Sequence, residues 1–243
     1  MPDSTAGRTG PTTAEPPWRT TRRPARQPLR QETIVATALR VLDKDGLEAV
    51  TMRRVAQELG TGPASLYAHV ANKDELLELL LDEVLGEIAL PEHPADEWRE
   101  GIRAITRASR LVLQRHRDVA KLAMVGVPTG PHGLRVTEVY LATLRTAGMP
   151  DQVCAWAVDR LALYVTADVL EGSLYRARHG WQTESDGCEY WQQLGDYLRG
   201  LPAESYPHTV QMVDALLAGN SDDRFEHGLD MILDGLAKYL PTR

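Results

Sequence analysis

Apolar residues recur every three or four positions through most of the chain, which is the spacing of one face of an α-helix. Apolar and polar residues never alternate over a sustained stretch, so no β-strand is predicted. Glycine and proline divide the pattern into roughly ten helical segments, and the sequence therefore predicts an all-α protein. The predicted helices cover residues 29–45, 52–59, 63–70, 73–88, 98–112, 117–126, 131–147, 151–178, 189–200, 206–218 and 222–240.

Several helix starts carry recognisable capping residues. Thr51 is expected to cap the helix at 52–59, and Asp151 the long helix that follows Pro150. Asn72 has Glu75 three residues on, which is the spacing of a capping box. Pro63 suits the first turn of a helix, because its missing N–H would have no partner there.

The helix at 52–59, the turn Gly60-Thr61-Gly62 and the helix at 63–70 have the lengths of a helix-turn-helix unit. The spacing turns Leu66 and Val70 inward and leaves Ser65, Tyr67 and His69 toward solvent. Exposed hydroxyl, phenol and imidazole groups on a short helix suit phosphate oxygens and base edges. The pattern therefore predicts DNA binding.

A formal net charge of −7 argues against a polyanionic partner such as nucleic acid, but the charge is unevenly distributed along the chain. Residues 1–73 carry 11 lysines and arginines against 7 acidic residues, a net +4, and the remainder carries −11. The basic part coincides with the helix-turn-helix. Residues 1–28 are rich in proline and arginine and predict a disordered basic arm, either an inert tail or a source of phosphate contacts through Arg22, Arg23 and Arg26.

No apolar run is long enough to cross a membrane, and the start of the chain has no secretory signal pattern. Cys154 and Cys188 do not form a close pair, which is typical of a reducing compartment. We therefore expect a cytoplasmic protein with no membrane partner.

The strings Leu-Tyr-x-His-Val at 66–70 and Asn-Lys-x-x-Leu-Leu at 72–77 together resemble the TetR family of repressors. The strings at 115–118 and 225–229 resemble its tetracycline-repressor branch. The resemblance implies a helix-turn-helix DNA-binding domain at 29–75 and an effector-binding and dimerisation domain at 76–243. It further implies a ligand-responsive regulator, most simply a repressor that leaves a palindromic operator when its effector binds.

Carried over by motif, Arg53 is the expected reader of a base, since a guanidinium can grip guanine O6 and N7 together. Pro63 stands where the tetracycline repressor has a base-reading glutamine, which predicts a different operator read more by shape and by contact with thymine methyl groups. The residues expected to contact DNA are Thr51, Arg53, Pro63, Ala64, Ser65, Tyr67, His69 and Lys73.

The resemblance places an effector pocket among the helices that follow the head, although ordinary core packing would give the same apolar spacing. The expected lining is Ile105, Ser109, Ala123, Met124, Val127, Tyr140, Trp156, Tyr164 and Asp168. Ala123, Ala89 and Ile105 fall near positions where the tetracycline repressor holds magnesium and drug through polar side chains. We therefore expect an apolar effector, with neither metal nor cofactor, and the histidines at 116, 132 and 208 are too widely spaced for a metal site.

A homodimer is expected through the helices near 151–178 and 222–240, whose long apolar stripes resemble the family's four-helix interface. The stripes could instead pack within one subunit. Two other functions remain open at this point, a helical enzyme and a protein-interaction adaptor. The sequence has no Gly-x-Ser-x-Gly, phosphate-binding loop, His-Glu-x-x-His or Cys/His cluster, so catalysis is not predicted.

Overall fold

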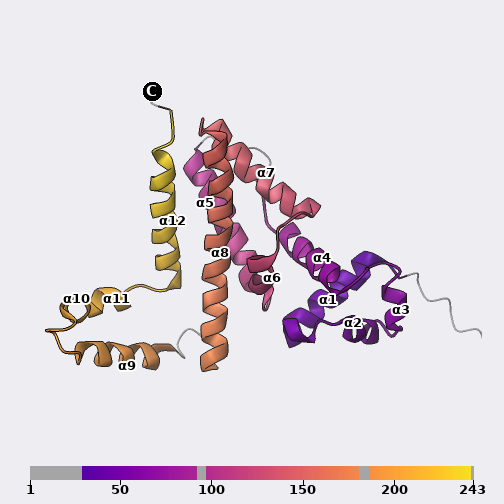
Figure 1. The fold of residues 1–243 in the computed structure, drawn as a ribbon, viewed down its shortest axis with the longest axis horizontal. Helices are drawn as coiled ribbons and strands as arrows, with labels where there is room; N and C mark the ends of the chain where they lie inside the picture. The colour runs from indigo at the N-terminus through magenta and orange to yellow at the C-terminus, as the bar shows by residue number, and fades with distance from the viewer. Residues whose placement is uncertain (1–28, 92–96, 181–186, 242–243) are drawn as a thin grey trace, which may run out of the picture.

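The computed structural model describes residues 29–91, 97–180 and 187–241 (Figure 1). Within these ranges every regular element is helical, so the all-α prediction is confirmed. The predicted arm at 1–28 and most of the predicted loop at 180–188 lie outside the described residues. The elements are α1 (Gln31–Asp45), η1 (Leu47–Ala49), α2 (Met52–Glu58), α3 (Pro63–Leu66), α4 (Lys73–Gly86), α5 (Trp98–Arg115), α6 (Val119–Val125), α7 (Pro131–Thr146), α8 (Asp151–His179), α9 (Cys188–Arg199), α10 (Pro207–Gln211), α11 (Val213–Leu217) and α12 (Ser221–Ala237).

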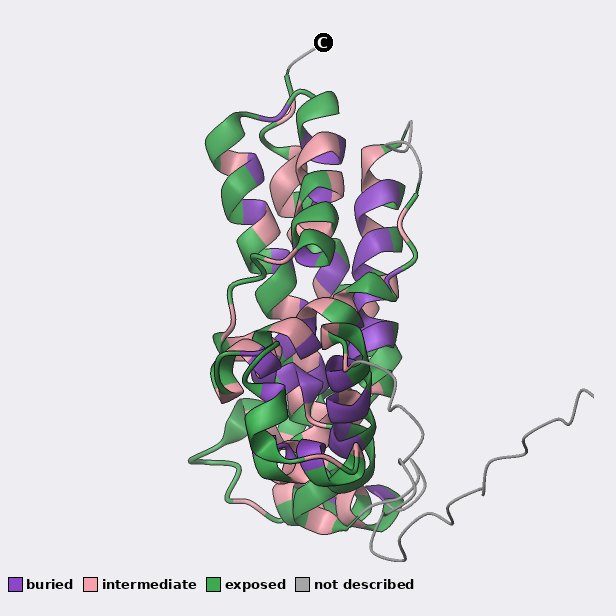
Figure 2. Ribbon diagram, turned by 90° about the vertical axis from the view of Figure 1, so that its right-hand side faces the viewer, coloured by how far each residue is buried: buried purple, intermediate pink, exposed green. Residues whose placement is uncertain are grey.

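Helices α1 to α3 form a small head, and α4 joins it to the body. α4 packs against α1 on the head side and against α7 on the body side. The bundle of α5, α6, α7 and α8 forms the body, and Figure 2 shows buried residues running along the inner sides of these helices. One contiguous apolar core extends from Ile34 in the head through Leu80 of α4 to Leu161 in the body. The head is therefore not an independent folding unit, because α4 packs against both the head and the body.

Three of the four predicted helix starts are confirmed, those at Thr51, Pro63 and Asn72, and the one at Asp151 is wrong. The Thr51 hydroxyl accepts the Arg54 N–H at 3.1 Å, and the side-chain oxygen Oδ1 of Asn72 accepts the Glu75 N–H at 2.9 Å. The Glu75 carboxylate accepts the N–H of Ala71 and not that of Asn72, so the second bond of the predicted capping box is not formed. Asp151 is not a cap: Pro150 holds the extended N-cap position with ψ of 143°. Asp151 is instead the first helical residue, and its carboxylate accepts a hydrogen bond from Arg145 Nε at 2.8 Å.

Two predicted helices are shorter than the pattern indicated. α3 ends at Leu66 rather than near Val70, and a turn follows in which the His69 N–H bonds to the Leu66 carbonyl at 2.9 Å. The backbone must leave the helix here because Asn72 has to be extended to cap α4. The predicted helix at 206–218 is divided at Met212, whose φ of −104° and ψ of 14° depart from α-helical values.

The connection between α5 and α6 holds the head against the body. The imidazole of His116 lies between two carboxylates, with Nδ1 3.1 Å from both oxygens of Asp43 on α1 and Nε2 3.1 Å from Glu87 Oε1 at the end of α4. Asp118 accepts the backbone N–H of Leu47 in η1 at 3.1 Å. These contacts link α1, η1 and the end of α4 to the connection between α5 and α6.

α12 runs antiparallel to α5, and a row of ion pairs joins the two helices. We call these contacts the α5–α12 row. Its pairs are Arg99–Asp234 at 2.9 Å, Arg103–Asp230 at 2.7 Å, Arg107–Glu226 at 2.6 Å and Arg110–Asp222 at 2.5 Å. Phe225, Leu229 and Leu233 on α12 are fully or almost fully buried within the chain.

Helices α9, α10 and α11 stand apart from the rest of the body in Figure 1. They pack mainly on one another, α9 against both α10 and α11. Several large side chains of α9, α10, α11 and the residues between them are exposed, among them Tyr197, Tyr206 and Leu216.

Candidate functional site

The turn between α2 and α3 fixes the angle of the helix-turn-helix. Gly60 has a φ of +61°, in the left-handed region that favours glycine. The Thr61 N–H then bonds to the Ala56 carbonyl at 2.9 Å, and the Thr61 hydroxyl lies 3.1 Å from the Ser65 hydroxyl in α3. Pro63 occupies the first turn of α3, as the sequence predicted. The turn is therefore closed by bonds on both sides.

Two adjacent arginines at the start of α2 have different surroundings. Arg54 bridges Asp45 and Glu58, with N–O distances of 3.0 and 2.8 Å. Arg53 is exposed, and none of the described residues holds its guanidinium in an ion pair or hydrogen bond. Arg54 therefore ties α2 to the end of α1, while Arg53 is the one whose guanidinium remains available to a polyanion.

The side chains of the recognition helix α3 and of the turn that follows it face inward and outward as the sequence predicted. Leu66 and Val70 are buried, whereas Tyr67 is 54% exposed and His69 is exposed. The Tyr67 ring therefore does not pack beneath the helix. The His69 carbonyl accepts a hydrogen bond from Gln31 Nε2 at 3.0 Å, which ties the end of the turn to α1.

None of the remaining predicted DNA contacts is buried. Pro63, Ala64 and Ser65 are exposed at the start of α3, and Thr51 is exposed at the start of α2. Lys73 is the first residue of α4, next to the helix N-terminus that Asn72 caps. An anion beside Lys73 would also meet the positive end of the α4 dipole.

Three of the predicted effector residues gather in the core of the body. Ile105, Ser109 and Tyr140 are buried between α5 and α7. The Tyr140 hydroxyl lies 3.1 Å from the hydroxyl of Thr106, which itself donates to the Ile102 carbonyl at 2.6 Å. Burial raises the pKa of Tyr140 to about 12, so the phenol stays protonated as a hydrogen-bond donor or acceptor.

Tyr164 and Asp168 on α8 bond to neighbouring helices, Tyr164 to α12 and Asp168 to α5. The Tyr164 hydroxyl donates to the Phe225 carbonyl at 2.7 Å, and their rings stack with centroids 5.2 Å apart. Burial raises the pKa of Tyr164. The Asp168 carboxylate accepts from Arg110 Nε at 2.7 Å. Tyr164 therefore helps to hold α8 against α12, and Asp168 helps to hold α8 against α5.

The other four predicted effector residues lie elsewhere. Trp156 is 65% exposed on the outer face of α8, and Ala123 is half-buried on α6. Met124 lines a hollow of about 320 Å³ against α8. Val127 lines a groove of about 400 Å³ beside α4. The nine residues are thus spread over the body and do not surround one cavity.

Sequence reasoning missed Thr106 and Arg110. Thr106 and Ser109 are one turn apart on α5, and two hydroxyls on an otherwise apolar face are a readable signal of a buried polar cluster. Arg110 is 7% exposed, and its partners Asp168 and Asp222 are distant in sequence. No local pattern identifies such partners.

Among residues 29–91, 97–180 and 187–241, no three histidine, cysteine or acidic side chains gather as metal ligands would. None of the helices in these ranges is long and apolar enough to cross a membrane.

Comparison with known proteins matches two family models to almost the whole folded chain. Residues 34–80 match the bacterial regulatory proteins of the tetR family, and residues 90–240 match the tetracyclin repressor-like C-terminal domain. The chain is 33% identical to the HTH-type transcriptional repressor DrrR1 of Streptomyces coeruleorubidus, covering 93% of this chain and 85% of that protein. It is 27% identical to the class C tetracycline repressor of Escherichia coli, over 88% of this chain and 93% of that one.

A solved structure is more similar still. The Streptomyces coelicolor TetR family protein ActR, in complex with actinorhodin, is 43% identical with a TM-score of 0.80. The match covers 88% of this chain and 97% of ActR. The likeness extends over the helix-turn-helix and the body alike.

Proposed function

Because the chain belongs to the TetR family of bacterial regulatory proteins, we propose that it is a repressor that leaves a palindromic operator when a small apolar effector binds its body. It is a ligand-responsive, DNA-binding transcriptional regulator and not an enzyme. The finer points concern which residues read DNA, where the effector sits and how two copies pair. The division at 29–75 and 76–243 is part of the proposal, as is a cytoplasmic location.

The observation that carries the DNA-binding role is the division of side chains on the helix-turn-helix. Leu66 and Val70 anchor the recognition helix, while Arg53, Tyr67 and His69 face outward without a described ion-pair partner. In our proposal Arg53 reads a base, and Thr51, Tyr67, His69 and Lys73 contact phosphates. Pro63 and Ala64 present small, apolar surface to the groove beside the small hydroxyl side chain of Ser65, which suits recognition by shape and thymine methyl groups.

For the effector we propose a site between α5 and α7, centred on the buried hydroxyls of Thr106, Ser109 and Tyr140. Buried polar groups in an apolar surround orient a ligand while the apolar walls supply affinity. These side chains offer hydroxyls rather than imidazoles or carboxylates, so the proposal keeps the effector free of metal. A ligand here acts only through its different affinities for the DNA-bound and free states.

One head reads only a few base pairs, so a palindromic operator requires two heads about one DNA turn apart. We propose that two copies pair through α8 and α12. On α8, Trp156, Leu163 and Leu174 are exposed, as is Met231 on α12. Phe225, Leu229 and Leu233 belong to the other face of α12, which is used within the chain, so only part of the predicted stripe is offered to a partner.

Fluorescence anisotropy with a labelled duplex from the promoter of the chain's own gene tests the DNA-binding role. We expect saturable binding that weakens steeply with salt, because phosphate contacts release counterions. An unrelated duplex of the same length and base composition is the control. Equal affinity for both duplexes would overturn the proposal of a specific operator.

The effector proposal is tested by adding actinorhodin, the ligand of the similar ActR, to the protein–DNA complex. Release of the duplex is expected, and Tyr140→Phe should raise the concentration needed for half release. Glu83→Gln on the exposed side of α4 is a matched control that should leave release unchanged. If Tyr140→Phe behaves as the wild type does, the site is not at Tyr140.

A further inference from the structure

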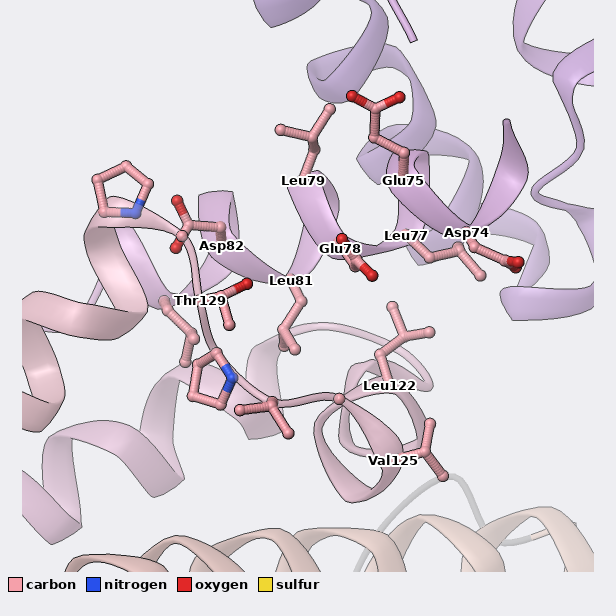
Figure 3. A pocket seen from close by; sticks show the side chains of 16 residues that line it. Asp74, Glu75, Leu77, Glu78, Leu79, Leu81, Asp82, Leu122, Val125 and Thr129 are labelled. Carbon is pink, nitrogen blue, oxygen red and sulfur yellow. The ribbon is translucent and has the colours of Figure 1, made fainter. Parts of the chain in front are cut away.

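A groove runs along the outer side of α4, opposite the connection between α6 and α7 (Figure 3). Its volume is about 400 Å³, which is within the range of small-molecule sites. α4 contributes Leu77, Leu81 and Leu85 to the wall, and residues 125–131 form the opposite side. Thr106, Ser109 and Tyr140 do not line it, so the groove is separate from the effector site proposed above.

The side of the groove formed by the α6–α7 connection is unusually apolar for a surface. Val125 is 84% exposed and Val127 is 79% exposed. Pro128 and Pro131 add further apolar surface and stiffen the connection. Covering adjacent aliphatic side chains of this kind releases ordered water and is favourable, so the groove suits a ligand with an apolar body.

α4 places a row of three carboxylates along the same groove. Asp74, Glu78 and Asp82 are spaced by four residues and therefore lie on one side of the helix. Among the described residues, none forms a hydrogen bond or ion pair with the carboxylate of Asp74 or Glu78. Like charges four residues apart on a helix repel one another, so a cation between them would be stabilised.

The third carboxylate, Asp82, is hydrogen-bonded within the chain and fixes the position of the backbone at the far end of the groove. Its carboxylate accepts the Gly133 N–H at 2.9 Å and the His132 N–H at 3.4 Å, at the start of α7. A Cβ at Gly130 would lie 2.3 Å from this carboxylate, so the backbone approaches α4 closely. The wall formed by residues 125–131 is thus held at a fixed separation from α4, and the groove is preformed.

We infer that the groove between α4 and residues 125–131 binds an organic monocation with an apolar body. The apolar part covers Val125, Val127 and Leu81, and the positive charge lies between Asp74 and Glu78. Since α4 leads directly from the recognition turn into the body, the ligand rests on the helix that carries the head.

Isothermal titration of the full chain with tetraphenylphosphonium tests this directly. The matched control is tetraphenylborate, an anion of nearly the same size and shape. We expect saturable binding of one phosphonium per chain, with the borate at least about tenfold weaker. Equal binding of the two ions would overturn the proposal, because the carboxylates would then play no part.

Variants locate the site. The double substitution Asp74→Asn and Glu78→Gln should weaken phosphonium binding at least about tenfold, with helix content and melting temperature as fold checks. Glu171→Gln is the matched control, since Glu171 lines the separate hollow of about 320 Å³ against α8. Val125→Lys, which places a cation at the rim, should also abolish binding. Loss of binding in Glu171→Gln but not in the α4 double variant would place the ligand in the α8 hollow and overturn the inference.

Discussion

The guanidinium of Arg110 lies over the ring of Phe225, with its central carbon 4.3 Å from the ring centroid. The same group donates to Asp168 on α8 at 2.7 Å and to Ser221 at the start of α12 at 2.9 Å. Burial disfavours the positive charge, but the hydrogen bonds to Asp168 and Asp222 outweigh it and raise the pKa of Arg110. Three helices, α5, α8 and α12, therefore meet at one side chain.

Arg110→Met should destabilise the protein by about 3–5 kcal/mol, because removing one member of a buried ion pair leaves the other without compensation. Asp168 is the group left behind, and its side chain is only 18% exposed. Urea denaturation followed by circular dichroism measures the loss at a fixed protein concentration, which matters if the chain dimerises.

The control for Arg110 is Arg145→Met. Arg145 pairs with Asp151, but both side chains are largely exposed, at 65% and 79%. An exposed pair contributes about 0–1 kcal/mol. A similar loss of stability in the two variants would show that burial does not increase the contribution of the Arg110 ion pairs.

The α5–α12 row predicts that the free energy of unfolding decreases at acidic pH. The hydrogen bond from Arg107 lowers the pKa of Glu226 below its ordinary value of 4.5, although burial acts in the opposite direction. A carboxylate with a lowered pKa stabilises the folded state above its unfolded pKa, and this contribution is lost as pH falls through the folded pKa. The stabilisation from Glu226 should therefore be complete at pH 7 and disappear progressively below about pH 4.5.

Urea midpoints of the wild type and of Glu226→Gln, measured from pH 7 to pH 3, check this expectation. The two midpoints should differ at pH 7 and converge in acid. A difference that stays constant across this range would mean that the Glu226 charge does not contribute.

Gly228 on α12 approaches Tyr164 on α8 so closely that a Cβ there would lie 2.3 Å from the Tyr164 hydroxyl oxygen. Gly228→Ala must displace the tyrosine and weaken its bond to the Phe225 carbonyl, at a cost of about 1–3 kcal/mol. Adding Tyr164→Phe should cost less in the alanine background than in the wild type. A double-mutant cycle by urea denaturation measures this coupling.

Gly235→Ala is the matched control on the same helix, since nothing lies within 4 Å of its Cβ position. It should be neutral or stabilise by up to about 1 kcal/mol, as alanine favours helix over glycine. Additive effects of Gly228→Ala and Tyr164→Phe would contradict the close contact.

Arg53 and Lys73 should differ in how they affect DNA binding. Arg53→Ala is expected to reduce discrimination between operator and unrelated DNA by about 1–3 kcal/mol, because a base contact is lost. Lys73→Ala should weaken both duplexes alike and lower the slope of log affinity against log salt by about one. Anisotropy titrations at several salt concentrations separate the two behaviours.

Arg54→Ala serves as the neighbouring control for Arg53. Arg54 is engaged with Asp45 and Glu58, so its loss should lower stability rather than sequence preference. If Arg54→Ala alone relaxes the preference, the roles of the two arginines are reversed.

The features that the sequence predicted correctly depend on neighbours within a few residues. Thr51 and Asn72 cap helices because each needs only a backbone N–H three residues on. Leu66 and Val70 are buried, as the apolar pattern predicts, although the helix itself ends at Leu66. The position of the helix-turn-helix and its exposed residues follows from these local rules.

The errors and omissions arise where distant groups decide. Asp151 was expected to cap α8, but its side chain pairs with Arg145 across the turn. Arg110 bonds to Asp222, 112 positions away, which no local pattern reveals. Tyr164 and Asp168 also bond to distant elements, Tyr164 to the Phe225 carbonyl on α12 and Asp168 to Arg110 on α5, and spacing along α8 does not reveal either partner.

The regular spacing of the α5–α12 row affects how strictly the register of α12 against α5 is fixed. Its acidic residues recur every four positions, and so do Phe225, Leu229 and Leu233 beneath them. If α12 shifted along α5 by one helical turn, most ion pairs and most apolar contacts would form again with partners four positions away. Features that do not repeat, among them the sole phenylalanine of the chain and the glycine against Tyr164, distinguish one register from the next.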